Sequence, residues 1–388
     1  MRMLVLGAGF QGSACAYDLL AHTDHEVVIA DLTIDKLAPF LQPYLGGRLT
    51  ALQVDANDRA AIRRTMEGAA ATMSALPYYL NLGMAVAAID AGSHFCDLGG
   101  NTEIVLKQKE LHERARSRGV SVIPDCGLAP GMVNILAAYG IRQLDHASAV
   151  RIKVGGLPQR PEPPLNYQLV YSLEGVLDYY TTPVWVLRDG RPAQVEALSE
   201  VEEVEMPGVG TLEAFQTAGG LSTMAQSYAG KIETMEYKTL RYPGHATTIR
   251  AIRDLGLIDT DPVEVKGQQV VPRDVFISIV TPHLHKDPHE NPDLVALRVE
   301  VEGEQNGEDV VLCWELVDRY DPQTGITAMM RTTGYSLALT GAFQAAGRVE
   351  PGVWTPDESV PAAAYIAALR ERGVQIREVR RVPAASAS

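Results

Sequence analysis

The sequence is poor in cysteine: its 388 residues contain only four, which lie far apart and form no C-x-x-C pair. This spacing excludes a tight disulfide framework and suits a reducing cytoplasm. Cys96 and Cys126 have no positively charged neighbour in the sequence that would favour a thiolate, so we expect both to be buried packing residues. The other two are Cys15 and Cys313.

Long apolar runs and an excess of positive charge are also absent. No stretch approaches the roughly 20 apolar residues of a membrane span, and no signal-peptide pattern precedes the first predicted strand. The chain has 34 basic and 48 acidic residues, a formal net charge of −14, which disfavours a broad phosphate-binding surface. We therefore expect a soluble cytoplasmic protein with no nucleic-acid or membrane partner.

Metal-ligand spacing is found only superficially. His283, His285 and His289 fall in a stretch rich in proline and charge, which is more typical of a solvated loop than of a zinc site. We expect no bound metal.

The first 145 residues alternate short apolar runs with longer helical patterns, as a parallel sheet with crossover helices requires. Strands are predicted at residues 3–6, 26–30, 49–53, 71–74, 94–97 and 121–123. Six strands with right-handed crossovers predict a doubly wound α/β sheet of the Rossmann type. With 388 residues, the chain is long enough for a second domain with its own core.

From residue 147 the pattern changes to the alternation typical of half-buried antiparallel strands. Strands are predicted at 150–154 and 184–187, a long hairpin at 294–302 and 309–318, a further strand at 325–331, and a stiff proline-dense loop at 155–164. These pieces predict a second, mixed α+β domain with an antiparallel sheet at 126–333. Helices at 334–346 and 356–372 and a strand near 374–379 are expected to complete the first domain, 1–125, through residues 334–388.

The first dozen residues predict a dinucleotide site. Gly7, Gly9 and Gly12 have the spacing G-x-G-x-x-G between a predicted strand and a predicted helix. Gly7 permits the tight turn after the strand, Gly9 lets the backbone approach a pyrophosphate, and Gly12 lets the helix pack closely on the sheet. The helix begins near Phe10 and Gln11, where unpaired N–H groups would face the phosphates.

Asp31 ends the second predicted strand, where a carboxylate accepts hydrogen bonds from ribose hydroxyls and repels a 2′-phosphate. The next three residues are not basic, so we expect the cofactor to be NAD rather than NADP. Other cofactor contacts are expected from Asp55 at the adenine edge and from Ala75, Leu76 and Leu98 near the nicotinamide. The alternative for Asp31 and Asp55 is a helix N-cap.

Three further segments, residues 93–101, 124–134 and 237–245, look suited to chemistry. The last is predicted to be loop-like and gathers Lys238, Arg241, Tyr242 and His245. Arg241 suits bidentate capture of a carboxylate, and its alternative is a surface arginine without a partner. His245 suits acid–base chemistry, and its alternative is a structural hydrogen-bonding role.

At these segments the sequence resembles the saccharopine dehydrogenase family, and within it the bacterial L-lysine 6-dehydrogenases. The matching stretches are G-A-G-F-Q-G at 7–12, D-L-G-G-N at 97–101, P-D-C-G-L-A-P-G-M-V-N at 124–134, V-G-G-L-P-Q-R-P-E-P-P at 154–164, S-L-E-G-V-L-D-Y-Y at 172–180 and Y-K-T-L-R-Y-P-G-H-A at 237–246. They span almost the whole chain.

The resemblance implies NAD-dependent oxidative deamination of L-lysine at its ε-amine, a dehydrogenase reaction on a CH–NH2 group. Hydride leaves the ε-carbon, water hydrolyses the imine and ammonia departs, which leaves 2-aminoadipate 6-semialdehyde that cyclises to piperideine-6-carboxylate. The substrate amine must be neutral, so a base has to take a proton from a group whose reference pKa is about 10.4.

For the catalytic base, four residues remain open: Asp97, Asp125, Tyr78 and His245. Arg241, Asp125 and Tyr242 are the expected substrate-binding residues. Two alternative functions also remain open. One is a reductase that makes or cleaves a secondary amine, such as saccharopine or carboxynorspermidine, and the other is an NAD-binding sensor without turnover. We expect a homo-oligomer that acts on a small amino acid.

Overall fold

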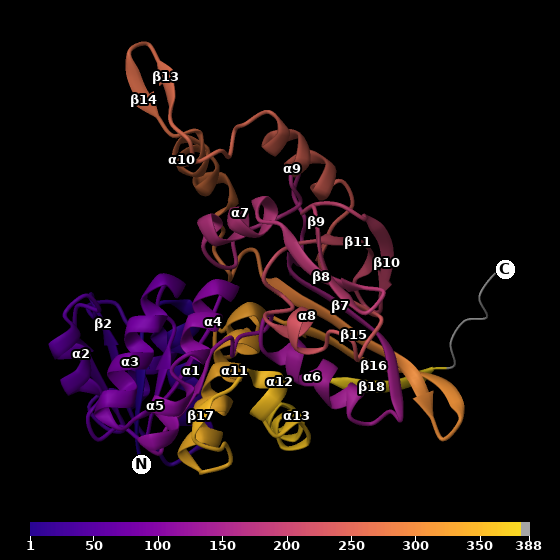
Figure 1. Cartoon of the computed structure of the whole chain (residues 1–388). Helices are drawn as coiled ribbons and strands as arrows, with labels where there is room; N and C mark the ends of the chain where they lie inside the picture. The colour runs from indigo at the N-terminus through magenta and orange to yellow at the C-terminus, as the bar shows by residue number, and fades with distance from the viewer. Residues whose placement is uncertain (382–388) are drawn as a thin grey trace.

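A seven-stranded parallel sheet forms the first part of the molecule (Figure 1). The structure, a computed structural model, describes residues 1–381. The elements of this part are β1 (Arg2–Leu6), α1 (Phe10–His22), β2 (Glu26–Asp31), η1 (Pro39–Tyr44), β3 (Leu49–Gln53), α2 (Arg59–Met66), β4 (Ala71–Ser74), η2 (Tyr78–Leu80), α3 (Asn81–Ala91), β5 (His94–Asp97), α4 (Thr102–Lys109), α5 (His112–Ser117), β6 (Ser121–Ile123) and, from near the C-terminus, β17 (Gly352–Val353). The strand order β17-β6-β5-β4-β1-β2-β3 confirms the predicted doubly wound sheet.

Strand β1 shows why buried strands of this sheet appear in the sequence as short apolar runs. Met3 and Val5 pack into one apolar cluster, whereas Leu4 and Leu6 pack into another. Successive side chains of a strand point to opposite faces, so the two clusters lie on the two faces of the sheet. A parallel sheet that is covered on both faces needs strands that are apolar throughout.

One predicted crossover helix takes a different form. Between β2 and β3 the chain forms only a 3₁₀ helix, η1, which contains Pro39 and Pro43. Proline has no backbone N–H to donate and its ring clashes with the preceding turn, so a regular α-helix is disfavoured there.

A nine-stranded, mostly antiparallel sheet forms the second part of the molecule and confirms the predicted mixed domain. Its elements are α6 (Met132–Ile141), β7 (His146–Pro158), α7 (Leu173–Thr181), β8 (Val184–Arg188), β9 (Arg191–Val195), β10 (Glu202–Met206), β11 (Gly210–Gln216), α8 (Met224–Ser227), β12 (Thr234–Arg241), α9 (His245–Asp254), α10 (Pro272–Leu284), β15 (Asp293–Gln305), β16 (Glu308–Arg319) and β18 (Arg377–Arg381). A separate hairpin, β13 (Val263–Val265) and β14 (Gln268–Val270), projects from this part beside α10 (Figure 1).

Two predictions for this part were wrong. Gly155 and Pro158, expected in a stiff loop, belong to β7 and pair with β15. The strand expected at 325–331 is absent from the described residues, where Ile326 forms an isolated bridge and a helix starts at Ala328. The helix starts there because the Thr327 side chain accepts a hydrogen bond of 3.1 Å from the N–H of Met330, an N-cap that overrides the alternation in sequence.

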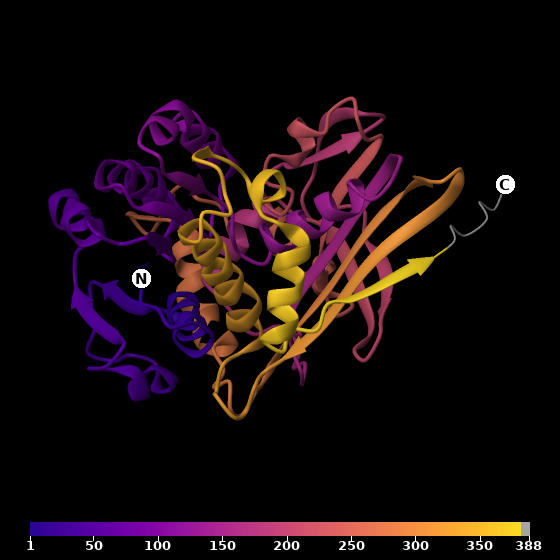
Figure 2. The same ribbon diagram turned by 90° about the horizontal axis from the view of Figure 1, so that it is seen from below.

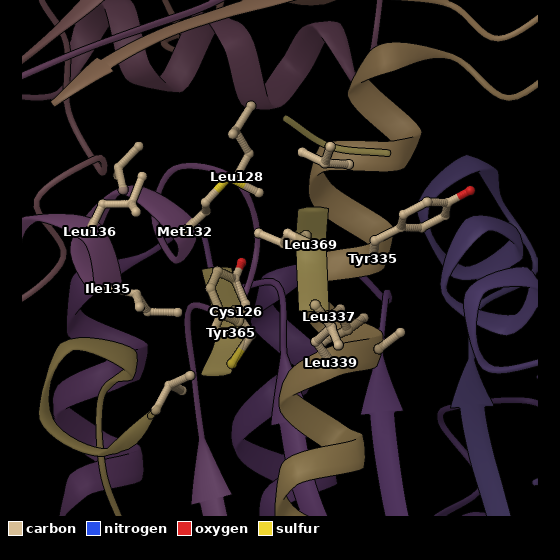
Figure 3. Packing of buried hydrophobic residues seen from close by; sticks show 14 of the residues in the cluster. Cys126, Leu128, Met132, Ile135, Leu136, Tyr335, Leu337, Leu339, Tyr365 and Leu369 are labelled. Carbon is tan, nitrogen blue, oxygen red and sulfur yellow. The ribbon is translucent and has the colours of Figure 1, made fainter. Parts of the chain in front are cut away.

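The C-terminal elements join the two parts. They are α11 (Ala328–Ala345), α12 (Pro356–Ser359) and α13 (Ala362–Glu371), and Figure 2 shows α11 and α13 between the two sheets. Tyr335 and Leu337 of α11 and Leu369 of α13 pack against Cys126 and Leu128 in one apolar cluster (Figure 3).

The C-terminal segment adds one strand to each sheet. It therefore does not complete the first domain alone, as was expected for residues 334–388. β17 extends the first sheet, but β18 pairs with β16 at the edge of the second. Strand β18 is rich in arginine, and Arg377 and Arg381 both form ion pairs with Glu315 of β16, which favours that edge. Residues 382–388 lie outside the described part.

All four cysteines are buried and free, as predicted for Cys96 and Cys126. Within residues 1–381 no helix is both long enough and apolar enough to cross a membrane.

Candidate active site

The glycine loop between β1 and α1 has the shape that a dinucleotide requires. Gly7 has φ +95°, which favours glycine, and a Cβ on Gly12 would collide with the carbonyl oxygen of Gly7. A Cβ on Gly9, the N-cap of α1, would meet no atom within 4 Å. The space above Gly9 is therefore open, and the loop fits the predicted pyrophosphate cradle. Ala75 backs this loop, since its carbonyl oxygen would lie 3.0 Å from a Cβ on Gly7.

The two acidic residues of the predicted adenosine end differ in their surroundings. Asp31 accepts hydrogen bonds from the backbone N–H of Ala8 at 2.6 Å and of Thr33 at 3.0 Å, so it holds the glycine loop to the end of β2. Asp55 is exposed and accepts a bond of 2.8 Å from the N–H of Asn57. Neither is a helix N-cap, because no α-helix follows β2 and the cap of α2 is Asp58.

Phe10 is exposed and lines a separate cavity of about 570 Å³ along the outer side of the glycine loop, together with Lys36 and Phe40.

A cavity of about 290 Å³ lies where the carboxyl edge of the parallel sheet meets the second sheet. Gln11, Leu76 and Leu98 line it from the first part of the chain. The second part contributes Val154, Gly155, Tyr171, Tyr179, Thr217, Tyr237, Thr239 and Arg241, and α11 contributes Met329 and Thr333. The structure thus brings predicted cofactor residues and the predicted carboxylate anchor into one cavity.

Arg241, at the end of β12, is a buried cation. Its side chain is 4% exposed, and its guanidinium lies over the ring of Tyr167, 4.7 Å from the ring centroid. One guanidinium nitrogen, Nη1, donates to the carbonyl of Leu240 at 2.9 Å, while Nε is buried without a partner.

The charge of Arg241 is surrounded by neutral groups. Burial acts to lower the pKa of Arg241, but the hydroxyls of Tyr180, Tyr167 and Tyr171 hold this pKa above its usual value. Glu213, its neighbour on β11, is engaged elsewhere and accepts bonds from the first N–H groups of α9. A buried guanidinium beside neutral phenols is a ready partner for an anionic ligand.

The segment 237–245 is a strand followed by a helix start, and not the predicted loop. Because side chains alternate along a strand, Tyr237, Thr239 and Arg241 face the cavity. Lys238 instead pairs with Glu202 at 3.0 Å on the other face.

His245 and Tyr242 do not line the cavity. His245 begins α9, with Nδ1 3.1 Å from the carbonyl of Leu165 and Nε2 3.1 Å from the hydroxyl of Tyr180. Burial and the charge of Arg241 lower the pKa of His245 to about 3, so this imidazole is neutral and suited to its structural alternative. Tyr242 donates to the carbonyl of Pro158 at 2.8 Å.

Asp97 and Asp125 form a buried carboxyl pair at the ends of β5 and β6. Asp97 accepts bonds of 2.7 Å from both Gly99 N–H and the Gln108 amide, so its oxygens are used in positioning the loop. Asp125 has one oxygen hydrogen-bonded to Ser222, while the other, Oδ1, is buried without a partner.

Asp125 lies directly behind the cavity wall. A Cβ on Gly99, which lines the cavity, would collide with Asp125 Oδ1. Burial, opposed by the hydrogen bond from Ser222, raises the pKa of Asp125 to about 7. Burial also raises the pKa of Asp97 to about 6, and there the opposing hydrogen bond comes from Gln108. Asp125 also has φ 61°, an uncommon conformation outside glycine that is enriched at functional sites.

Tyr78 lines a second cavity of about 440 Å³. This cavity shares Tyr179, Thr217, Ala218 and Tyr237 with the first, so the two adjoin. No cluster of metal-ligating side chains occurs in the described part of the chain.

The tyrosines around Arg241 were not among the residues predicted for the site. The signal was present, because Tyr167, Tyr171, Tyr179 and Tyr180 crowd a short segment of a chain that is only 6% aromatic. Clustered aromatic residues are as typical of a hydrophobic core as of a binding site, so the sequence alone did not distinguish the two roles.

Two family models cover most of the chain. The model "Saccharopine dehydrogenase NADP binding domain" matches residues 3–123, and "Saccharopine dehydrogenase C-terminal domain" matches residues 127–374.

Curated proteins and a solved structure are also similar. The saccharopine dehydrogenase (NADP+, L-glutamate-forming) of Schizosaccharomyces pombe is 25% identical over 66% of this chain and 58% of that protein. The carboxyaminopropylagmatine dehydrogenase of Synechocystis is 20% identical, with 97% of each chain covered. The structure of apo saccharopine dehydrogenase (L-Glu forming) from Saccharomyces cerevisiae matches with a TM-score of 0.80 and 18% identity, covering 98% of this chain and 100% of that one. This last likeness supports the fold alone.

Proposed function

Since this chain belongs to the saccharopine dehydrogenase family, we propose that it is an NAD(P)-dependent oxidoreductase acting on a C–N bond of an amino-acid substrate. The chain spans 58% of the S. pombe relative and 61% of the S. cerevisiae relative, so the activity is a proposal for this chain and is not carried over from them.

Arg241 is the observation that carries the proposal. It is a buried guanidinium among neutral phenols, in a cavity that also reaches the predicted nicotinamide side of the parallel sheet at Leu76 and Leu98. A carboxylate held there compensates a buried charge and leaves the far end of an amino acid free to extend toward the sheet. Distance from Arg241 then selects the carbon that reacts.

Asp125 is the residue we assign to proton transfer. Its pKa of about 7 is matched to work near neutral pH, and Oδ1 lacks a partner. The Asp97 carboxyl accepts a hydrogen bond from the N–H of Gly99 and so positions Gly99, which separates Asp125 from the cavity. Asp125 receives the proton that a substrate ammonium must lose before its carbon can give up hydride.

The nicotinamide cofactor, when bound, supplies the two-electron hydride acceptor. Gly7, Gly9 and Gly12 would hold its pyrophosphate, and Asp31 its adenosine ribose. The carboxylate at the end of β2 opposes a 2′-phosphate, and on that ground we propose NAD as the preferred form. The family model is named for NADP, so this preference needs a direct test.

Two substrates are proposed for this chemistry. The stretches at 154–164, 172–180 and 237–246 favour L-lysine, oxidised at its ε-carbon with release of ammonia. The similar proteins favour a secondary amine, since saccharopine dehydrogenase and carboxyaminopropylagmatine dehydrogenase are named for such substrates.

One comparison of assays tests the proposal. NAD reduction is measured with L-lysine, and NADH or NADPH oxidation is measured with 2-aminoadipate 6-semialdehyde plus an amine. Turnover in the first with ammonia release supports lysine deamination, and turnover only in the second supports the secondary-amine reaction. Nucleotide binding without either reaction would contradict the oxidoreductase proposal and favour a sensor.

A further inference from the structure

A chain of hydrogen bonds behind Arg241 joins segments that are distant in the sequence. The imidazole of His245 lies between the carbonyl of Leu165, 3.1 Å from Nδ1, and the hydroxyl of Tyr180, 3.1 Å from Nε2. The Tyr180 hydroxyl in turn hydrogen-bonds the guanidinium of Arg241. Arg241 lines the cavity of about 290 Å³, whereas Tyr180 and His245 lie behind it. The hydrogen-bonded chain therefore ends at the cavity wall.

Only one direction of donation fits this chain. The carbonyl of Leu165 can only accept, so Nδ1 of His245 must carry the ring proton. Burial and the charge of Arg241 keep His245 neutral by lowering its pKa to about 3. A neutral imidazole has one N–H, so Nε2 is an acceptor and the hydroxyl of Tyr180 donates to it.

The direction of donation determines what Tyr180 offers to the guanidinium. A phenol has a single O–H, and this one is directed to His245. Only oxygen lone pairs remain on the side of Arg241, and these accept a guanidinium N–H. With the opposite tautomer, Nε2 would donate to Tyr180, and the freed O–H would face a cation that has no acceptor. His245 therefore acts on Arg241 through Tyr180.

Close packing holds the members of this chain in place. Tyr180 is 2% exposed and His245 is 3% exposed. The ring of Phe215 stacks on the imidazole, with 6.2 Å between the ring centroids and 11° between the planes. Helix α9 begins with His245, and its first turn is fixed to β11 because Glu213 accepts a hydrogen bond of 2.6 Å from the N–H of Ala246. The imidazole is thus supported by two strands' worth of structure rather than by a loop.

The guanidinium of Arg241 is held by three kinds of contact. Nη1 donates to the carbonyl of Leu240 at 2.9 Å, and the ring centroid of Tyr167 lies 4.7 Å from the guanidinium carbon. The oxygen of Tyr180 supplies the third contact. Together they restrict the rotation of a long side chain, so the remaining N–H groups are held in one orientation for a ligand in the cavity.

We propose that His245 and Tyr180 are positioning residues, which fix the direction of hydrogen bonding toward Arg241 and so orient its guanidinium for a carboxylate in the cavity. The inference rests on the proposed function, in which Arg241 binds the carboxylate of the substrate. It gives a role to the histidine of the 237–246 stretch, which does not line the cavity.

The test measures ligand discrimination, which a loss of stability alone does not change. Isothermal calorimetry on the full-length protein with NADH compares the Kd of L-lysine with that of L-lysinamide, in which a neutral amide replaces the carboxylate. Tyr180→Phe and His245→Phe break the chain, and His245→Gln keeps one donor and one acceptor. Tyr180→Phe also keeps the ring that packs beside Phe215, so it should fold.

The matched control is Tyr242→Phe. This change also removes a phenol hydroxyl next to Arg241 in the sequence, but that hydroxyl donates to the carbonyl of Pro158, outside the cavity. A second readout, ¹⁵N NMR of labelled histidine, reports which ring nitrogen of His245 carries the proton. Its signal is assigned by its loss in His245→Gln.

We expect the parent to bind L-lysine more tightly than L-lysinamide and to carry the His245 proton on Nδ1. Tyr180→Phe and His245→Phe should reduce the ratio of the two Kd values about fivefold or more, because the guanidinium loses its acceptor. His245→Gln and Tyr242→Phe should stay within about twofold of the parent.

Three results overturn the inference: a proton on Nε2, a Kd ratio that Tyr180→Phe leaves unchanged, or equal losses in the two His245 variants. A parent that binds both ligands equally also overturns it. If the ratio falls as expected but the parent is inactive in both assays of the proposed function, the positioning role stands and the proposed function fails.

Discussion

The two adjoining cavities differ in the sign of their charge and in how deeply that charge is buried. The first contains Arg241, which is 4% exposed and surrounded by neutral phenols. The second is lined by Glu103, which is exposed to solvent on α4. Charge–charge interactions are stronger where water is excluded. The buried cation should therefore contribute more to ligand affinity than the exposed acid.

The largest effect is expected at the wall between the cavities. Asp125→Asn keeps the size of the side chain but removes its ability to accept a proton. We expect kcat to fall about 100-fold or more, and the remaining activity should lose the rise near pH 7 that the pKa of Asp125 gives the parent. Steady-state rates from pH 6 to 9 are the measurement.

The control for Asp125→Asn is its melting temperature, which should not fall, because the amide relieves the cost of a buried ionised carboxyl. A kcat within threefold of the parent, in a folded protein, would exclude Asp125 as the base.

Arg241→Lys tests the cationic cavity. Lysine keeps the charge but loses the planar fork, so we expect kcat/KM for the amino-acid substrate to fall roughly tenfold or more, equivalent to about 1.4 kcal/mol. The NAD Kd should be unchanged. Cadaverine, which lacks the carboxylate, provides the internal comparison if it is a substrate, and its kcat/KM should change far less. Equal losses for both amines would mean that Arg241 serves another group.

Substitutions at the adenosine end of the cofactor site should change the choice of cofactor without affecting either cavity. Replacing Asp31 with Ser and Leu32 with Arg removes repulsion and adds a phosphate partner, so preference should move toward NADP by roughly tenfold. Because Asp31 also holds the Ala8 N–H, Asp31→Asn with the same Leu32 change is the matched variant that keeps an acceptor. The ratio of kcat/KM for the two cofactors is the readout, and a parent that already uses both equally would contradict our reading of Asp31.

The last effect concerns the pH dependence of stability, and it does not involve catalysis. The pKa of Asp125 is about 7 in the folded protein and near 4 when unfolded, so the folded state holds a proton that the unfolded state has lost between these values. Its contribution to the free energy of unfolding is full below pH 4 and is lost as pH rises toward 7. Asp125→Asn should reduce this fall by up to about 1.4 kcal/mol per pH unit. Urea unfolding at pH 5 and 6.5 measures it, and parallel pH dependences for the two proteins would contradict the assignment.

Local patterns predicted much of the first part of the molecule. The strands β1 to β6 lie within a residue or two of their predicted bounds. Strands β1, β4, β5 and β6 are buried almost throughout, so they appear in the sequence as short, mostly apolar runs. The glycine spacing between β1 and α1 likewise depends only on neighbours in sequence. The resemblance named the family correctly, because specific stretches run through almost the whole chain.

The surroundings of the site residues and the position of the C-terminal strand were less predictable because they depend on partners that are distant in the sequence. Asp97 and Asp125 look alike in sequence, each at a strand end, yet Gln108 occupies an oxygen of one and Ser222 an oxygen of the other. The strand expected near 374–379 forms at 377–381. Its place beside β16 is favoured by ion pairs with Glu315, which the sequence did not show.

By itself the sequence determined the parallel sheet, the glycine loop and the residue types available for chemistry, since these follow from spacing along one short segment. Only the tertiary structure decided which of those residues meet. The alternation of β12 turns Arg241 inward and Lys238 away, and the packing of α7 and the 167–171 segment surrounds the guanidinium with phenols. Burial and the side to which a strand residue points depend on contacts between distant segments, and these decide the charge of each cavity.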